Sequence, residues 1–159
     1  VDGIPALCEI LIDCVEGGAS VGFMTPMTPD KAQAFWRNVV QGVAIGQRAL
    51  LVAVIDGQAL GTVQVILGQP ENQPHRGDLS KLLVHRRARK TGLGAALMRA
   101  ADQAARDAGK TLLVLDTASS DAERLYEREG WVRVGAVPGY ALLPDGAPCD
   151  THIFFKPIA

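Results

Sequence analysis

A strand, a short basic loop and a long helix follow one another in the middle of the chain, and this succession constrains the fold more than any other feature. Residues 77–84 alternate between polar and apolar character, which predicts a strand. Residues 92–108 carry apolar side chains on one helical face and charged ones on the other, and Gly109 follows as a stop signal. The loop at 89–94 therefore ends at the start of a helix, where unpaired N–H groups and the helix dipole favour an anion.

The composition of this loop suits a phosphate group without specifying one. Gly92 and Gly94 have no side chain that would keep a ligand away from the N–H groups. Positive charge next to them comes from Arg86, Arg87, Arg89 and Lys90. No Gly-Lys-Ser/Thr follows, which excludes a P-loop, and the three-glycine dinucleotide fingerprint is absent. Taken alone, the loop is equally typical of a tight turn with a solvated basic cluster.

The other segments predict one mixed α/β domain that spans residues 1–159. Helical spacing and capping signals predict further helices at 4–15, about 29–43 and 121–129. Runs rich in β-branched and apolar residues predict strands at 49–55, 59–67, 111–115, 131–137 and 151–155. Asp56-Gly57 is a strong hairpin turn, and the proline and glycine residues of 138–150 predict a long loop between the last two strands.

Composition and charge exclude several classes of function. The chain has 159 residues, of which 48% are apolar and 21% are charged, a balance typical of a globular domain. A formal net charge of −1 gives no field that would recruit nucleic acid or an anionic membrane, and no stretch approaches the roughly 20 apolar residues of a membrane helix. The three cysteines are expected to be reduced thiols of a cytoplasmic protein. No metal is expected, because neither they nor the three histidines have ligand spacing.

Two motifs of the sequence resemble one known superfamily. R-x-x-G-x-G, which is Arg89 to Gly94 here, resembles the acyl-CoA-binding motif of the GNAT superfamily of N-acetyltransferases. Residues 119–131 read S-S-D-A-E-R-L-Y-E-R-E-G-W and resemble its second motif, N-x-x-A-x-x-L-Y-E-x-x-G-[FW]. The segments most similar to tabtoxin-resistance-type acetyltransferases are 17–24, 81–84, 115–117 and 133–140.

The resemblance implies the GNAT fold, a mixed and mostly antiparallel sheet flanked by helices. Against that family the chain begins inside the first helix. We therefore expect the domain to be N-terminally incomplete and the family's first edge strand to be absent.

The resemblance also implies acetyl-CoA as the co-substrate. The backbone of Leu83 and Val84 would pair with the pantetheine arm. The pyrophosphate would be bound by Arg89, Lys90, Thr91, Gly92, Leu93 and Gly94. Ser119 replaces the motif asparagine that bonds the pantetheine, so either Ser119 or Ser120 would make that contact. Ala122 would leave room for the cofactor, although an ordinary helix alanine satisfies the same pattern.

Three residues are candidates for the chemistry. The motif implies that Tyr126 is the acid that protonates the departing thiolate, and the alternative is a buried tyrosine that only packs its ring. Asp116 ends an apolar strand, where a charge needs a reason, and Asp78 begins the strand before it. The resemblance implies that both line the acceptor site. The alternatives are a strand-end cap for Asp116 and a solvated strand-edge carboxylate for Asp78.

The acceptor is the least specified part of the prediction. Two loops with small and aromatic residues are expected to bind it, through Gly18, Ser20, Phe23 and Tyr140. The resemblance implies direct transfer to a primary amine of a small, amino-acid-like molecule, with antibiotic or toxin detoxification as one use. Two alternatives stay open, a protein or polyamine N-acetyltransferase and a non-catalytic acyl-CoA sensor. No nucleic-acid or membrane partner is expected, and the sequence leaves open whether the protein is a monomer or a homodimer.

Overall fold

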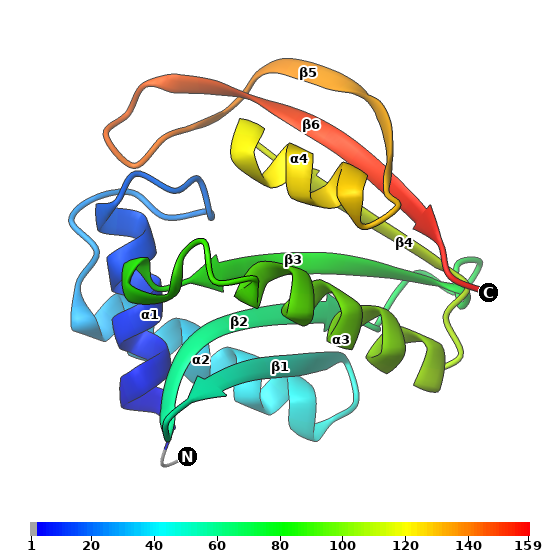
Figure 1. The fold of residues 1–159 in the computed structure, drawn as a ribbon, viewed down its shortest axis with the longest axis horizontal. Helices are drawn as coiled ribbons and strands as arrows, with labels where there is room; N and C mark the ends of the chain where they lie inside the picture. Colours follow the sequence, from blue (N-terminus) through cyan, green and yellow to red (C-terminus); the bar gives the residue numbers. More distant parts are fainter. Residues whose placement is uncertain (1–2) are drawn as a thin grey trace.

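The computed structural model describes residues 3–159 and contains one six-stranded sheet flanked by four α-helices (Figure 1). The strand order is β1-β2-β3-β4-β6-β5, and every neighbouring pair is antiparallel except β3–β4. The strands are β1 (Arg48–Ile55), β2 (Gln58–Ile66), β3 (Arg76–Val84), β4 (Leu112–Thr117), β5 (Val132–Leu142) and β6 (Pro148–Pro157). The helices are α1 (Ile4–Glu16), α2 (Pro29–Ala44), α3 (Leu93–Asp107) and α4 (Ser120–Arg128), with a short 3₁₀ helix η1 (Arg86–Ala88).

This architecture confirms the predicted fold class, and no strand precedes α1 within residues 3–159. The expectation about a missing first strand concerns positions outside the described residues. No helix in the described part of the chain is long and apolar enough to cross a membrane.

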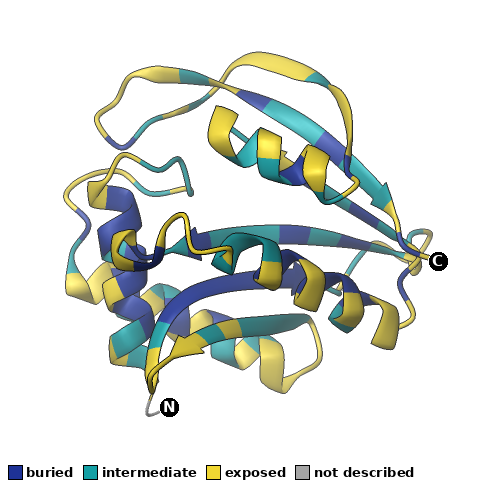
Figure 2. Ribbon diagram, in the orientation of Figure 1, coloured by how far each residue is buried: buried dark blue, intermediate teal, exposed yellow. Residues whose placement is uncertain are grey.

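Two hydrophobic cores hold the helices against the sheet. On one face, α1 and α2 bury Leu11, Trp36 and Val39 completely. On the other face, α3 and α4 pack over β2, β4 and β6 around residues such as Met98 and Phe154. Figure 2 shows this burial concentrated along α1 and β2, whereas β5 is largely exposed. The buried side chains of the sheet therefore come mainly from β2, β3, β4 and β6.

The strands β3 and β4 pair over a few residues only and then separate. Their register joins Arg76 to Leu112 and ends where Asp78 faces Val114. Beyond that point, among the strands that the structure describes, β3 is bonded only to β2, and β4 only to β6. Figure 1 shows the two strands meeting near the C-terminus and diverging toward the other end of the sheet. Within the described residues, the far half of β3 up to Val84 therefore has one edge without a strand partner.

The long loop predicted at 138–150 is wrong, because this segment is a strand hairpin. β5 runs on to Leu142 and β6 begins at Pro148, which leaves only a short turn between them. Pro138 and Gly139 indicated a loop because both residues weaken the interior of a sheet. β5 is an edge strand, however, and an irregularity in its register accommodates them, with a φ of 60° at Gly139.

Candidate active site

The N-terminus of α3 is open to an anion. Gly92 precedes it with a φ of 82°, a left-handed conformation that glycine adopts without strain. Among residues 3–159, no side chain caps this helix, whereas the hydroxyls of Thr28 and Ser119 cap α2 and α4. The first amides of α3 therefore keep their capacity to bind a phosphate oxygen. Gly94 allows close packing here, because a Cβ at this position would lie 3.1 Å from a methyl carbon of Leu125.

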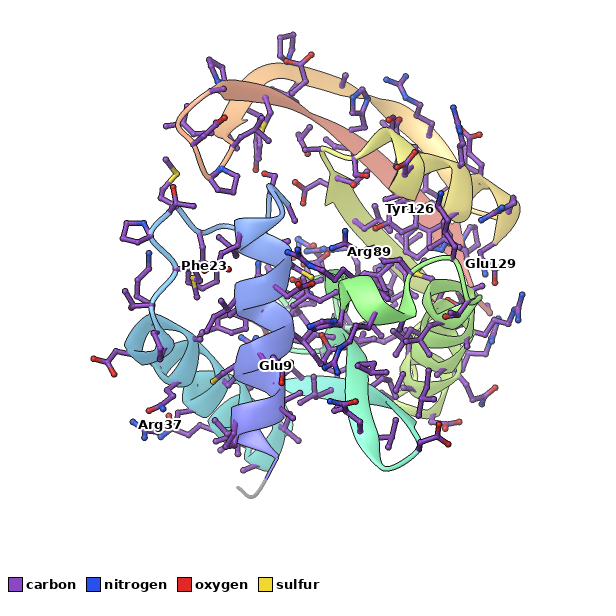
Figure 3. The ribbon with its side chains drawn as sticks, turned by 60° about the vertical axis from the view of Figure 1, so that its left-hand side comes forward. Glu9, Phe23, Arg37, Arg89, Tyr126 and Glu129 are labelled. Carbon is purple, nitrogen blue, oxygen red and sulfur yellow. The ribbon has the colours of Figure 1, made fainter. Side chains whose placement is uncertain are left out.

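A buried acid of α1 holds the basic loop in place. Asp13 accepts hydrogen bonds from the backbone N–H of Arg86, at 3.0 Å, and from its guanidinium group. Arg89 Nη2 lies 3.9 Å from the same carboxylate. Burial acts to raise the pKa of Asp13, but the hydrogen bonds from Arg86 and the charges of His85 and Arg86 outweigh it and hold the pKa below its usual value. Figure 3 shows Arg89 beside α1.

The basic residues of the loop are therefore not equivalent. Arg87 is paired with Glu9 of α1 at 3.0 Å. Arg89 is half-exposed, and its Nε donates to the carbonyl oxygen of Val84 at 3.3 Å. Lys90 forms no ion pair within residues 3–159. Arg89 and Lys90 are consequently more available to bind a phosphate than Arg86 and Arg87 are.

The other residues predicted on the donor side have local partners. Leu83 is buried in the core beneath α1 and α2, and the hydroxyl of Thr91 donates to the backbone of η1. Leu93 and Ala122 pack against the core between α3 and α4. Ser119 Oγ accepts from the N–H of Ala122 at 3.2 Å, so its role as a helix cap competes with any contact to pantetheine.

Tyr126 projects from α4 into the aromatic core (Figure 3). Its ring centroid is 5.7 Å from that of Phe154 and 6.2 Å from that of Trp131. Burial raises the pKa of the phenol to about 12, although a hydrogen bond with Thr117 acts in the opposite direction. The phenol is protonated at neutral pH, as a proton donor must be. The buried ring also fits the alternative, in which this tyrosine only packs its ring.

Asp78 and Asp116 line one cavity of about 330 Å³ at the point where β3 and β4 separate. Asp78 is ion-paired with Arg76 and accepts from Gln69 Nε2 at 3.1 Å. Asp116 is exposed, and its Oδ2 accepts from the hydroxyl of Thr151 at 2.8 Å. The two predicted acids thus come together, and only Asp116 lacks a cationic partner among the described residues.

The loop after α1 lies against the β5–β6 hairpin. The N–H and hydroxyl of Thr25 both donate to the carbonyl oxygen of Pro144, at 3.0 and 2.8 Å. Ser20 Oγ lies 3.7 Å from Cys149 Sγ. Gly18 lines a cavity of about 260 Å³ between the end of α1 and the hairpin turn. The two segments that were predicted to bind the acceptor are therefore neighbours in space.

The two aromatic residues predicted for the acceptor have different surroundings. Phe23 packs edge-on against Phe35 of α2, with ring centroids 5.3 Å apart. Tyr140 is 60% exposed and lies on β5 rather than on a loop. Phe23 is thus packed against α2, whereas the side chain of Tyr140 lies on the exposed surface of a strand.

Lys81 was not predicted as a site residue, and it lies where β3 is irregular. The register shifts between the pairs Thr62–Leu83 and Gln64–Ser80, and Lys81 has a φ of 55°. Burial lowers the pKa of its ammonium group. The consecutive apolar residues that follow Lys81 break the strand alternation and could have indicated the bulge.

Asp13 was not predicted as a site residue either. A carboxylate among the apolar residues of the first helix was the available signal, because a buried charge needs a partner. Its partner lies more than seventy positions away in the chain. Within residues 3–159, no group of three or more His, Cys, Asp or Glu side chains is placed to hold a metal, and all three cysteines are free thiols.

Solved structures share this architecture. The ribosomal-protein-alanine N-acetyltransferase from Brucella melitensis superposes with a TM-score of 0.81 at 23% identity, over 98% of this chain and 94% of that one. The yncA protein of Salmonella typhimurium, solved with its cofactor acetyl-CoA, superposes with a TM-score of 0.83 at 19% identity, over 99% and 90% of the two chains. The fold is that of the GNAT acetyltransferases.

Sequence comparison agrees with the fold. The sequence model of the acetyltransferase (GNAT) family matches residues 5–131. An uncharacterized N-acetyltransferase encoded in the hisH-hisA intergenic region of Azospirillum brasilense is 30% identical over 112 residues. That match covers 69% of this chain and only 65% of the relative's length. The chain belongs to the GNAT acetyltransferase family.

Proposed function

We propose that the chain is an acetyl-CoA-dependent N-acetyltransferase that moves the acetyl group directly to a primary amine of a small, amino-acid-like acceptor. One observation carries the proposal: the unpaired edge of β3 begins at a cavity lined by Asp116 and ends at the loop that leads to the uncapped start of α3. The acetyl-CoA in the yncA structure supports the donor. The likeness of 17–24 and 133–140 to tabtoxin-resistance-type enzymes supports the acceptor class and a use in detoxification.

The donor side fits the parts of CoA one by one. The amides at the start of α3, with Arg89 and Lys90, suit a pyrophosphate. The open edge of β3 up to Val84 suits a chain that carries amide groups, which would add to the sheet as a strand does. When bound, the thioester supplies an acetyl group on a thiolate that leaves readily, since free thiols have a pKa of about 8.5.

The chain's own side chains then supply the remaining needs of acyl transfer. Asp116 attracts the acceptor ammonium and takes up its proton through water, which leaves a neutral amine. The amine nitrogen forms a bond to the acetyl carbon while the bond from that carbon to sulfur breaks, and the nitrogen then releases its second proton to solvent through water. Tyr126 donates the phenolic proton to the departing sulfur and regains a proton from solvent.

A thiol-release screen tests this proposal. Acetyl-CoA is expected to raise the melting temperature by several degrees at saturation. Free CoA is then expected with amino-acid-like amines in a panel that also holds polyamines, aminoglycosides and peptides. The absence of any thermal shift would contradict the donor assignment. Stabilisation without turnover on every amine would favour an acyl-CoA sensor, and turnover only on polyamines or peptides would replace the acceptor class.

A further inference from the structure

The acceptor side of the sheet carries charges of both signs that find no ionic partner within residues 3–159. Asp78 is neutralised by Arg76, but Asp116 accepts only from the neutral hydroxyl of Thr151 near its strand end. On the neighbouring strand, Lys81 takes part in no ion pair and no side-chain hydrogen bond of the described residues. An unpaired carboxylate and an unpaired ammonium thus flank the separation of β3 and β4.

The ammonium group of Lys81 is held in position by its surroundings. Its Nζ lies 5.9 Å from the ring centroid of Phe35, a cation–π distance. A Cβ placed on Gly22 would lie 3.7 Å from the same Nζ, so the loop after α1 closes over it. Phe23, on that loop, packs edge-on against Phe35. The cation therefore lies between α2 and the loop that is predicted to bind the acceptor, and not in open solvent.

A second cation reinforces the positive charge of this region. Arg48 Nη1 donates to Oε1 of the fully buried Gln64 at 2.8 Å, and Gln64 faces Ser80 across β2 and β3. Burial lowers the pKa of Lys81; the negative charge of Asp116 acts to raise this pKa, and the positive charge of Arg48 acts to lower it. An acceptor with only ammonium groups would place a like charge next to Lys81, at a cost in free energy.

We propose that the acceptor carries a carboxylate, that Lys81 binds this carboxylate, and that Asp116 binds the ammonium group that becomes acetylated. The inference rests on the proposed function and narrows its acceptor to a zwitterion of the amino-acid type. Lys81 thereby determines specificity against polyamines.

The test compares matched acceptors on matched variants. Each amino acid that the wild-type protein acetylates is assayed together with its α-carboxamide and its decarboxylated amine. Wild-type kcat/KM is expected to favour the acid by at least about tenfold, mainly through KM. Lys81→Met should remove this preference, and Lys81→Arg should keep most of it. Arg37→Met is the control, because Arg37 is an exposed cation on α2 that points away from the site (Figure 3).

A binding measurement separates this inference from the proposed catalysis. Calorimetry in the presence of CoA compares the N-acetyl amino acid with its carboxamide, for wild-type protein and Lys81→Met. A preference for the acid that Lys81→Met abolishes supports the inference even when no amine is turned over. Equal use or binding of acid and amide, or a preference that survives Lys81→Met in the folded protein, overturns it. Turnover of acids and amides alike leaves the acetyltransferase proposal standing.

Discussion

Backbone groups build most of the proposed donor side of the molecule, whereas side chains from separate segments build the proposed acceptor side. The start of α3 and the free edge of β3 are contiguous elements, joined by η1 and a short loop. The acceptor side combines Asp116 of β4, Lys81 of β3, Phe23 of a loop and the β5–β6 hairpin. Recognition by backbone leaves a short motif in the sequence, but recognition by scattered side chains leaves none.

The largest effect is expected from Tyr126→Phe, at the residue proposed to protonate the leaving thiolate. The variant keeps the ring that packs against Phe154 and Trp131 and removes only the proton donor. We expect kcat to fall by about 100-fold or more, with little change in the KM for acetyl-CoA. Steady-state thiol release checks this, with circular dichroism to verify folding. An undiminished kcat would mean that Tyr126 serves packing alone.

A smaller effect, on stability as well as on binding, is expected from Asp13→Asn. The variant weakens the ionic contacts to Arg86 and Arg89, so the free energy of unfolding at pH 7 should fall by about 1–3 kcal/mol, and acetyl-CoA should bind more weakly. Glu16→Gln, on the exposed end of the same helix, is the control.

The pH dependence of this effect has a defined sign. The pKa of Asp13 is lowered in the folded state, so its contribution to stability is present above the ordinary aspartate pKa of about 3.9 and is lost as the pH falls below that value. The free energies of unfolding in urea of wild-type and Asp13→Asn protein should therefore become equal as the pH is lowered from about 4. A constant gap would contradict the ion-pair assignment.

The smallest effect is expected from a pair of glycine variants that share one kind of strain. Gly92 and Gly146 have φ values of 82° and 95°, and a Cβ would have no neighbour within 4 Å at either position. Replacement by alanine should destabilise the fold by about 1–2 kcal/mol in each case. Only Gly92→Ala should also weaken acetyl-CoA binding, because only its methyl group lies next to the free amides of α3. Equal affinities of the two variants for acetyl-CoA would contradict the assignment of this loop to the donor.

The sequence predicted most of the fold because its signals are local. Hydrophobic periodicity and turn residues placed the helices and five of the six strands near their observed bounds. The error at 138–150 has a tertiary cause, since β5 tolerates proline and glycine because no strand in the described part of the chain pairs with its outer edge.

The candidate site was predicted unevenly for the same reason. The motif predicted a phosphate site at Gly92, and the structure adds that Asp13 holds the loop from a distant helix. Asp78 and Asp116 were predicted from their strand ends, and the structure adds that only Asp78 has a cationic partner. Lys81 could not be predicted as a site residue, because its importance comes from a bulge and from neighbours on α2.

The donor assignment is tested most directly by titrating the protein with CoA while its backbone amides are followed by NMR. We expect saturable shifts that are largest at residues 89–95 and at the end of β3 near Val84. The capped start of α2, around Lys31, provides an internal reference that should change little. Shifts that avoid residues 89–95, or that are as large at the start of α2, would contradict the assignment of this loop to the donor.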